Sequence, residues 1–270
     1  MRRLETRHWT FLGLLVCIGA AMLINIRPDT PVSAETRRMF DFIDSLPEGS
    51  TLLVSFDHEA SSLPEIRPIG LAILRHAFAK GHRLIGVALL AEGTVIGYRL
   101  MQRTAAEYGR EYGKDYVYLG FRPQYIAAIL SMAESIPKTF PEDYLGRPIE
   151  QFACMQGIVN YDDVAAVISI ADGSLTTHWM EYGQAPERIT VLCGMTAAMV
   201  TTYDPYLASG QMHAMVGGLI GAAQYEQLIE KGGGGQRGMP AQTTAHLYVI
   251  ALVLLGNFIY FLSRRKGKRP

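Results

Sequence analysis

The hydrophobic pattern divides the chain into two long apolar stretches near its ends and a segment of mixed character between them. Residues 9–26 and 245–263 contain no Asp, Glu, Lys or Arg, and both stretches are apolar. A helix needs roughly 17–25 apolar residues to cross the hydrocarbon core of a bilayer. The pattern therefore predicts one N-terminal and one C-terminal transmembrane helix.

Between these stretches, short apolar runs alternate with longer segments in which apolar residues recur at i, i+3 and i+4. The short runs indicate buried strands and the longer segments indicate helices. The expected strands are 51–56, 83–90, 116–119, 164–170 and 189–193, and the expected helices are 66–78, 95–108, 124–135, 175–182 and 212–229. Strands that alternate with helices form parallel βαβ units. We therefore predict an α/β fold, a three-layer sandwich with a mainly parallel sheet of about five strands.

The same pattern predicts the boundaries of the parts. We expect a basic tail over 1–8, a transmembrane helix over 9–26, a tether over 27–50, an α/β domain over 51–230, a glycine-rich linker over 231–244, a second transmembrane helix over 245–263 and a basic tail over 264–270. The linker begins with four consecutive glycines after Lys231, which favour a flexible conformation.

The distribution of charge predicts the orientation in the membrane. The chain has 25 basic and 25 acidic side chains, so its formal net charge is zero. Resolved along the chain, this becomes +2 before the first apolar stretch, −7 between the stretches, from 17 basic and 24 acidic side chains, and +5 after the second. Lys and Arg near the ends of membrane spans stay in the cytoplasm. We therefore predict a two-pass protein of the cell (inner) membrane with both termini inside and residues 27–244 extracytoplasmic.

The apolar segments allow two other interpretations. Val32-Ser33-Ala34 resembles a signal-peptidase site, so the first stretch is either an uncleaved anchor, which we favour, or a signal peptide cleaved after Ala34. The charge-free residues 205–225 are a candidate for a further span, but their apolar core over 212–223 is too short. We expect a core helix there.

Acidic residues follow two of the predicted strands. Asp57 and Glu59 come after the first strand, and Asp172 comes after the fourth. In open α/β sheets, ligands bind at the carboxyl ends of the strands. These carboxylates, with Lys114, are therefore candidates for binding a ligand or a hard cation. The alternative, which we favour, is that they form turns and cap helices.

The expected phosphate-binding and hydrolase motifs are absent from the positions where they would act. The first strand-to-helix turn, FDHEASSLPE, contains no G-x-G-x-x-G and no G-x-x-x-x-G-K-[ST], and the chain contains no G-x-S-x-G and no H-E-x-x-H. We therefore expect no cofactor, no resident metal and no catalytic residue. Cys154 and Cys193 are the cysteines outside the apolar stretches, and they either form a disulfide or remain buried thiols.

A tyrosine-rich segment, YGREYGKDYVYLGFRP at 108–123, is a candidate interaction surface. Tyr and Arg are common anchors of protein interfaces, which selects Tyr112, Tyr116 and Arg122. The alternative is that the tyrosines are half-buried against the sheet where the next strand begins.

Three segments of the chain are similar to a known group of proteins. They are EYGREYGKDYVYLGF, LLVSFDHEASSLPEIRPIGLAILRHAF and SGQMHAMVGGLIGAAQYE. Across residues 50–230 the chain resembles a family of bacterial membrane-anchored α/β (Rossmann-like) hypothetical proteins without an assigned activity. The resemblance implies a shared fold and membrane setting, and it transfers no catalytic residue.

Two functions are compatible with these observations. The first, which we favour, is a membrane-tethered, non-catalytic binding or assembly component of an envelope complex, with the membrane and either protein partners or a second copy of the chain as its partners. The alternative is a membrane-anchored enzyme or small-ligand or metal-binding protein that uses the strand-end carboxylates. A nucleic-acid partner is not expected, because a formal net charge of zero excludes a strongly basic nucleic-acid binder.

Overall fold

The computed structural model describes residues 5–23, 30–184 and 189–265. The chain forms two compact units, which are described separately. One unit, Thr30–Gly235, is the α/β domain, and the other comprises the terminal segments Met1–Asp29 and Gln236–Pro270.

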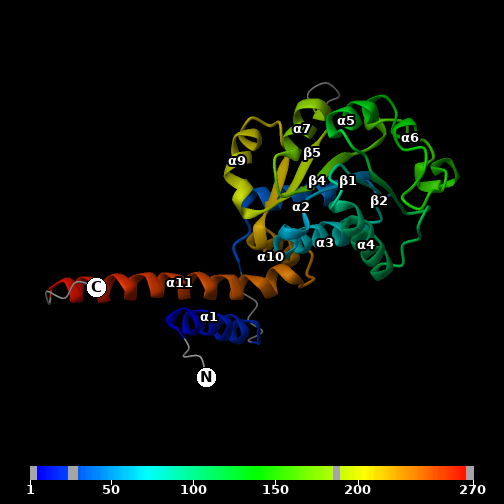
Figure 1. Ribbon diagram of the computed structural model, residues 1–270. Coiled ribbons are helices and arrows are strands. Elements are labelled where there is room, and N and C mark those ends of the chain that lie inside the picture. Colours follow the sequence, from blue (N-terminus) through cyan, green and yellow to red (C-terminus); the bar gives the residue numbers. More distant parts are fainter. Residues whose placement is uncertain (1–4, 24–29, 185–188, 266–270) are drawn as a thin grey trace. The chain divides into compact units, whose positions relative to one another are not determined.

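A single six-stranded sheet forms the centre of the domain (Figure 1). Its strands are β1 Thr51–Asp57, β2 Arg83–Ala88, β3 Tyr116–Phe121, β4 Ala166–Ala171, β5 Val191–Met195 and β6 Ala214–Gly217. The order across the sheet is β3-β2-β1-β4-β5-β6, and each neighbouring pair is parallel. The strand order reverses between β1 and β4, as in Rossmann-like folds. The predicted α/β class with a parallel sheet is confirmed.

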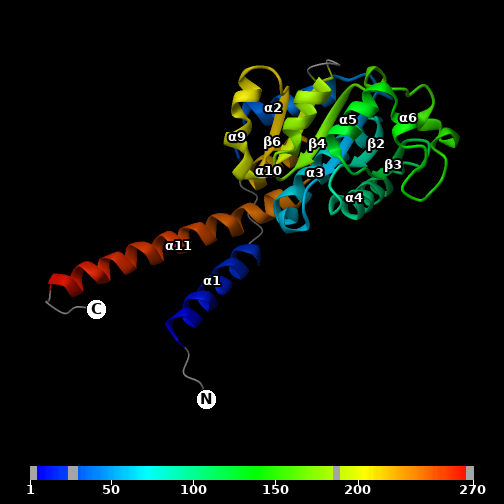
Figure 2. The same ribbon diagram turned by 45° about the horizontal axis from the view of Figure 1, so that its top comes forward.

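Helices cover both faces of the sheet, which gives the predicted three layers (Figure 2). One face packs against α2 Ala34–Ser45, α3 Leu63–Ala79, α4 Gly93–Glu107 and α10 Gly218–Leu228. The other face packs against α5 Tyr125–Glu134, α6 Ile136–Thr139, α7 Leu175–His178, the π-helical turn η5 Trp179–Gln184, α9 Ala197–Ala208 and the 3₁₀ turns η2 Ile149–Gln151, η3 Ala153–Met155 and η4 Tyr161–Asp163. A further 3₁₀ turn, η1 Ala60–Ser62, precedes α3.

The central strands are largely apolar because both of their faces are covered. All residues of β1 and β4 are buried. Successive side chains of β1 enter opposite cores, with Leu53 in one cluster and Leu52 and Val54 in the other. A parallel sheet that is buried on both faces requires such continuous apolar runs, which explains why the sequence pattern located these strands.

The sixth strand was not predicted. The sequence favoured one helix over 212–229, whereas the structure has β6 followed directly by α10. The break falls at Gly218, whose φ of +61° favours glycine, and a Cβ added at this position would lie 2.8 Å from the Cβ of Ala197. Residues 205–225 are thus divided among α9, β6 and α10, which removes the third-span alternative.

The tether predicted over 27–50 is a helix for much of its described length. Helix α2 begins after Ser33, whose side chain accepts a hydrogen bond from the Thr36 amide as an N-cap. Its buried residues Met39 and Ile43 belong to the core. Helix α9 was also missed. Residues 27–29 lie outside the described part of the chain.

The glycine run packs against the domain, and a helix begins within it. Helix α11, Gly234–Arg265, begins inside the segment predicted as a linker. The amides of Gly233 and Gly235 donate to the Glu226 carboxylate at 3.0 and 2.9 Å. A Cβ on Gly235 would lie 2.5 Å from the amide nitrogen of Ala223 in α10. The close approach of two backbones therefore requires glycine here.

Among the described residues, one helix is long and apolar enough to cross a membrane, and it covers Gly234–Arg264. The N-terminal stretch forms α1, Thr6–Leu23, a shorter apolar helix that does not reach this length. We expected two membrane spans, and one helix of the described chain qualifies as a span. Residues 24–26 of the expected first span lie outside the described residues. Within the terminal unit, the Tyr248 hydroxyl donates to the Thr10 carbonyl at 3.0 Å.

We expect Gly235→Ala to lower the free energy of unfolding by roughly 1–3 kcal/mol, because the added methyl group would overlap the α10 backbone. The measurement is chemical denaturation of the purified full-length protein in detergent. Gly256→Ala is the matched control, since it lies in the same helix with open space around its Cα and should leave stability unchanged or slightly higher. Equal stability of the two variants would contradict the packing role of Gly235.

Candidate functional site

A cavity of about 200 Å³ opens at the carboxyl ends of β1 and β4, where the strand order reverses. Its lining consists of Asp57, Glu59, Leu90, Tyr125, Asp172, Gly173, Ser174, Leu175 and His178. We call it the crevice. The three carboxylates selected from the sequence all line it, so the structure brings them together at the place where open α/β sheets bind ligands.

The pairing of β1 with β4 explains this convergence. Asp57 is the register partner of Ala171, so Asp172 follows at the same edge of the sheet. The Glu59 amide donates to Asp172 Oδ2 at 2.8 Å. Asp172 therefore ties the turn after β1 to the end of β4 and holds Glu59 at the mouth of the crevice.

Asp57 is the buried base of the crevice, with an exposed fraction of 1%. Its Oδ1 accepts hydrogen bonds from Ser55 Oγ at 2.7 Å and from the Leu89 amide at 3.1 Å. Its Oδ2 accepts from Ser169 Oγ and Trp179 Nε1, each at 3.1 Å. Burial raises the pKa of Asp57, and the four donors act against that rise. Both oxygens are engaged, so Asp57 positions other elements and is not a free ligand group.

The sequence pattern did not lead us to the donors to Asp57, although two of them occupy positions that could have indicated their role. Ser55 and Ser169 are polar residues inside otherwise apolar strands, and they are register partners in adjacent strands. A buried hydroxyl at matching positions of two strands indicates a shared polar partner. Trp179 carries no such signal, because its position depends on a π-helical turn.

Aromatic rings form another wall of the crevice. Tyr125 is 38% exposed, and its ring stacks on His178 with 4.7 Å between the centroids. The His178 ring also stacks on Tyr182, with 6.0 Å between the centroids. The buried Nδ1 of His178 has no hydrogen-bond partner among the described residues, and Glu181 Oε2 lies 3.7 Å from it. The sequence did not identify Tyr125 or His178, because the packing of α5 against α7 brings them to the crevice.

The crevice suits a cationic molecule better than an anionic one. The salt bridges of the described residues include neither Glu59 nor Asp172. Two carboxylates without a basic partner beside aromatic rings are the groups that recognise organic cations. No group of three or more His, Cys, Asp or Glu arranged for a metal occurs in the part of the chain that the structure describes.

Rossmann-like folds commonly bind dinucleotides, but the residues of this turn do not fit one. A dinucleotide pyrophosphate needs free backbone amides in a glycine-rich turn after the first strand. Here the Glu59 amide donates to Asp172, and the Ala60 amide donates to Glu92 Oε2 at 2.8 Å. Carboxylates therefore occupy the amides that would hold phosphate, and they would repel it.

Lys114 does not join the carboxylates. It precedes β3, and its ammonium group lies 3.5 Å from Glu111 Oε1. Because the sheet is parallel, the start of β3 lies at the opposite edge from the carboxyl ends of β1 and β4. Lys114 is thus removed from the candidate site.

The tyrosine-rich segment contributes mainly to the interior. Tyr116 is 4% exposed. The Tyr112 hydroxyl donates to Asp143 Oδ2 at 2.9 Å, and the Arg147 guanidinium lies 4.6 Å from the centre of the Tyr112 ring. Arg122 donates to the Thr139 carbonyl. The structure therefore supports the half-buried alternative for Tyr112 and does not offer Tyr116 as an exposed contact.

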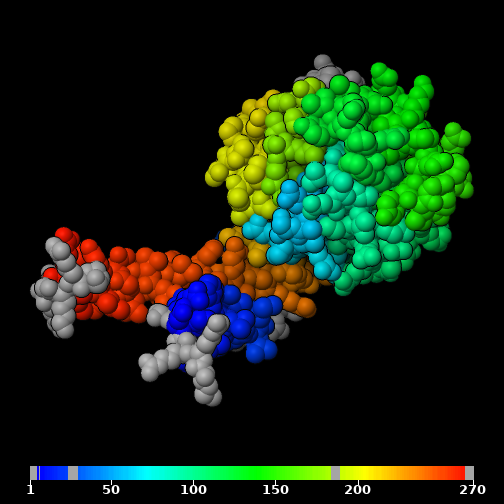
Figure 3. All heavy atoms as spheres, in the orientation of Figure 1, coloured from blue at the N-terminus to red at the C-terminus, as the bar shows by residue number. Residues whose placement is uncertain are grey.

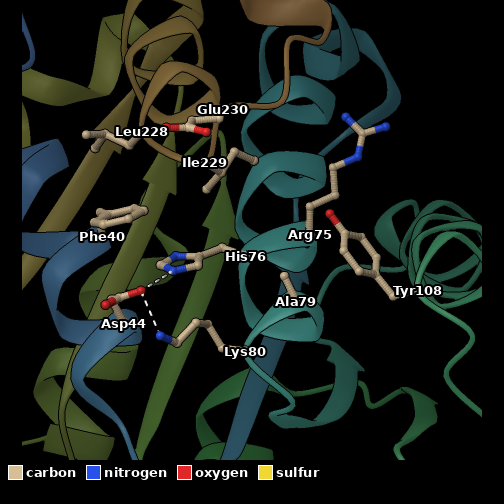
Figure 4. Close-up of a pocket in the computed structure, with 10 residues that line it drawn as sticks. All are labelled: Phe40, Asp44, Arg75, His76, Ala79, Lys80, Tyr108, Leu228, Ile229 and Glu230. Carbon is tan, nitrogen blue, oxygen red and sulfur yellow. Dashed lines mark hydrogen bonds and ion pairs between the residues drawn. The ribbon is translucent and has the colours of Figure 1, made fainter.

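A second cavity of about 220 Å³ lies between α2, α3 and the end of α10 (Figure 4). Its basic side chains are already paired, since Asp44 Oδ1 lies 3.0 Å from Lys80 Nζ and Arg75 Nε lies 2.8 Å from Glu107 Oε2. The Tyr225 hydroxyl is 2.8 Å from His76 Nδ1, and burial lowers the pKa of His76 to about 4. With its cations paired, this cavity is a weaker candidate than the crevice.

Neither domain cysteine offers a reactive thiolate or a disulfide. Cys154 and Cys193 are free and buried. Burial raises the pKa of Cys154 to about 11 and that of Cys193 to about 12. Both thiols are therefore protonated at neutral pH, which makes them poor nucleophiles.

Comparison with models of protein families and with curated proteins finds no match to this chain. The class of protein is therefore defined by the fold and the crevice alone: a Rossmann-like α/β domain with an acidic and aromatic crevice at its switch point.

We expect Asp57→Asn to lower the free energy of unfolding by about 1–3 kcal/mol, because the new amide would face N–H and O–H donors and leave one of them unsatisfied. Thermal unfolding of the detergent-solubilised protein measures the change. Asp204→Asn, an exposed aspartate in α9, is the control and should leave stability unchanged. Unaltered stability of Asp57→Asn would show that the buried network does not stabilise the fold.

Proposed function

We propose that this protein is a membrane-tethered, non-catalytic binding component whose domain holds a small organic cation in the crevice between β1 and β4. The observation that carries the proposal is the meeting of Glu59 and Asp172 with Tyr125 and His178 in one cavity at the switch point of the sheet. The alternative of turn-forming carboxylates explains the Asp172 contact to the Glu59 amide, but not the aromatic wall beside them.

Electrostatics favours a positively charged ligand. Glu59 and Asp172 have no basic partner among the described residues, so no protein cation offsets the repulsion between their charges. An ammonium group between them would relieve this repulsion, and its apolar substituents would contact the rings of Tyr125 and His178. A volume of about 200 Å³ limits the ligand to a small molecule.

The crevice favours binding over catalysis. Asp57, whose pKa is raised by burial, has both oxygens in hydrogen bonds to protein donors. It is therefore unable to move a proton to or from a ligand without breaking that network. The thiols of Cys154 and Cys193 are buried and protonated, so neither is an activated nucleophile.

The membrane setting completes the proposal. Helix α11 is long and apolar enough to span a bilayer. We extend this to a two-pass arrangement with α1 as the second anchor, both termini inside and residues 27–244 outside, on the basis of the basic tails. A tethered domain that binds without catalysing acts through a partner, so a protein of the same envelope or a second copy of the chain belongs to the proposal.

The ligand class is tested by calorimetric titration of the full-length protein in detergent with choline, with putrescine and with 3,3-dimethylbutanol, the uncharged isostere of choline. We expect one of the two cations, choline or putrescine (together called the amines below), to bind. The isostere should bind at least tenfold more weakly, because it lacks the charge. Glu59→Gln and Asp172→Asn should each weaken amine binding roughly tenfold, the equivalent of about 1.4 kcal/mol.

Glu150→Gln is the matched control for these substitutions, because Glu150 is exposed in η2 outside the crevice. It should bind amines as the unmodified protein does. Binding of dimethylbutanol as tight as that of choline, or an absence of any amine binding at millimolar concentration, would contradict a cation site.

The orientation is tested by labelling single cysteines in intact cells with a membrane-impermeant maleimide, in a Cys17→Ser background. The buried Cys154 and Cys193 should stay unlabelled. We expect Ser61→Cys, in the exposed turn before α3, to react in intact cells and Glu5→Cys to react only after permeabilisation. Labelling of Glu5→Cys from outside would overturn the two-pass arrangement.

A further inference from the structure

A cavity of about 400 Å³ lies between α3 and α4, outside the crevice. Its lining consists of Leu63, Arg67, Ile96, Arg99, Leu100 and Arg103. The two helices lie side by side in both ribbon views, and their atoms form adjoining parts of one face in the space-filling view (Figure 3). We call this cavity the arginine groove.

The groove has an apolar floor and a cationic rim. Arg99 and Arg103 are four residues apart, so they project from the same side of α4. Arg67 projects from α3, and Leu100 is buried at 6% exposure. Gly70 allows α3 to approach this leucine closely, since a Cβ there would lie 3.1 Å from Leu100 Cδ2.

The positive charge of the groove is not balanced by the domain. Arg67 and Arg99 form no salt bridge among the described residues. Arg103 lies 3.9 Å from Glu107, but the same carboxylate is closer to Arg75, at 2.8 Å, and to Lys231, at 3.3 Å. Like charges four residues apart on a helix repel each other. An unbalanced cluster of arginines in an otherwise acidic domain indicates a site for an anion.

We propose that the arginine groove binds the phosphate headgroup of an anionic phospholipid. Guanidinium groups pair with phosphate oxygens through parallel N–H donors, which suits a phosphodiester better than a single lysine would. The apolar floor of Leu63, Ile96 and Leu100 provides the surface that the glycerol and upper acyl carbons require. A soluble inorganic anion would use only the rim.

The position of the groove along the chain supports a lipid as the occupant. Arg67 precedes Pro68, and a Cβ on Gly234 would lie 2.9 Å from the Cγ of Pro68. Gly234 is the first residue of α11, the helix that is apolar enough to span a membrane. Within the domain, the residue after Arg67 therefore packs against the first residue of the helix that is apolar enough to span a membrane. The inference rests on the membrane tether of the proposed function and is independent of the ligand in the crevice.

The test is native mass spectrometry of the full-length protein released from detergent micelles with increasing phosphatidylglycerol or phosphatidylcholine. We expect one phosphatidylglycerol adduct to form in preference to phosphatidylcholine. The double variant Arg67→Gln/Arg99→Gln should weaken this adduct on the order of tenfold or more, because each arginine near a membrane surface contributes about fivefold. Thermal unfolding would verify that the variant is folded.

Arg37→Gln/Arg38→Gln is the matched control, since it removes two exposed arginines of α2 and the same net charge. It should keep the phosphatidylglycerol adduct. Equal binding by the two double variants, or equal adducts with both lipids, would overturn the site. Displacement of phosphatidylglycerol by equimolar glycerol 3-phosphate would overturn the lipid as occupant and indicate a soluble phosphate ester.

The crevice variant Glu59→Gln separates this inference from the proposed function. It should bind phosphatidylglycerol as the unmodified protein does, because Glu59 lines the crevice and does not line the arginine groove. If the unmodified protein binds lipid but no amine, the cation site in the crevice is contradicted and the lipid site stands. If it binds amine but no lipid, the lipid site in the arginine groove is contradicted and the cation site stands.

Discussion

The buried carboxylate of Asp57 is the interaction on which the architecture around the crevice depends. Its four donors come from β1, from the residue after β2, from β4 and from the π-helical turn that follows α7. Removing a carboxylate from water costs desolvation free energy. The four hydrogen bonds offset this cost only when all four elements are in place. The same carboxylate therefore fixes both the central strands and the wall that carries the aromatic rings.

The sequence was sufficient to predict the alternation of strands and helices, because burial on both faces makes β1 and β4 largely apolar. It was insufficient for β6, since a four-residue strand followed directly by a helix has no polar turn to mark it. The segment that forms α2 has apolar residues at helical spacing, but it also carries many charged residues, which are common in exposed tethers. The start of α11 inside the glycine run was not predictable, because close packing and flexibility select the same residue.

The candidate site shows the same division. Glu59 and Asp172 could be placed together from the sequence, because the carboxyl ends of parallel strands meet at one edge of a sheet. Tyr125 and His178 could not, since they meet only through the packing of α5 against α7. Arg67 and Arg99 likewise lie in separate helices, and no spacing in the sequence relates them. The meeting of residues at the carboxyl ends of neighbouring parallel strands was predictable from the sequence. Contacts between residues of different helices were not.

The strand order also has a consequence for synthesis of the chain. β1 is the first strand made, yet it lies in the middle of the sheet, and the Ser169 hydroxyl that reaches Asp57 follows it by 112 residues. Until β4 has been synthesised, one edge of β1 lacks its partner strand. Exposed strand edges of this kind promote association between chains. A nascent chain that stalls between β3 and β4 would therefore present an apolar strand with one unpaired edge, and it would be prone to associate with other chains before the sheet is complete.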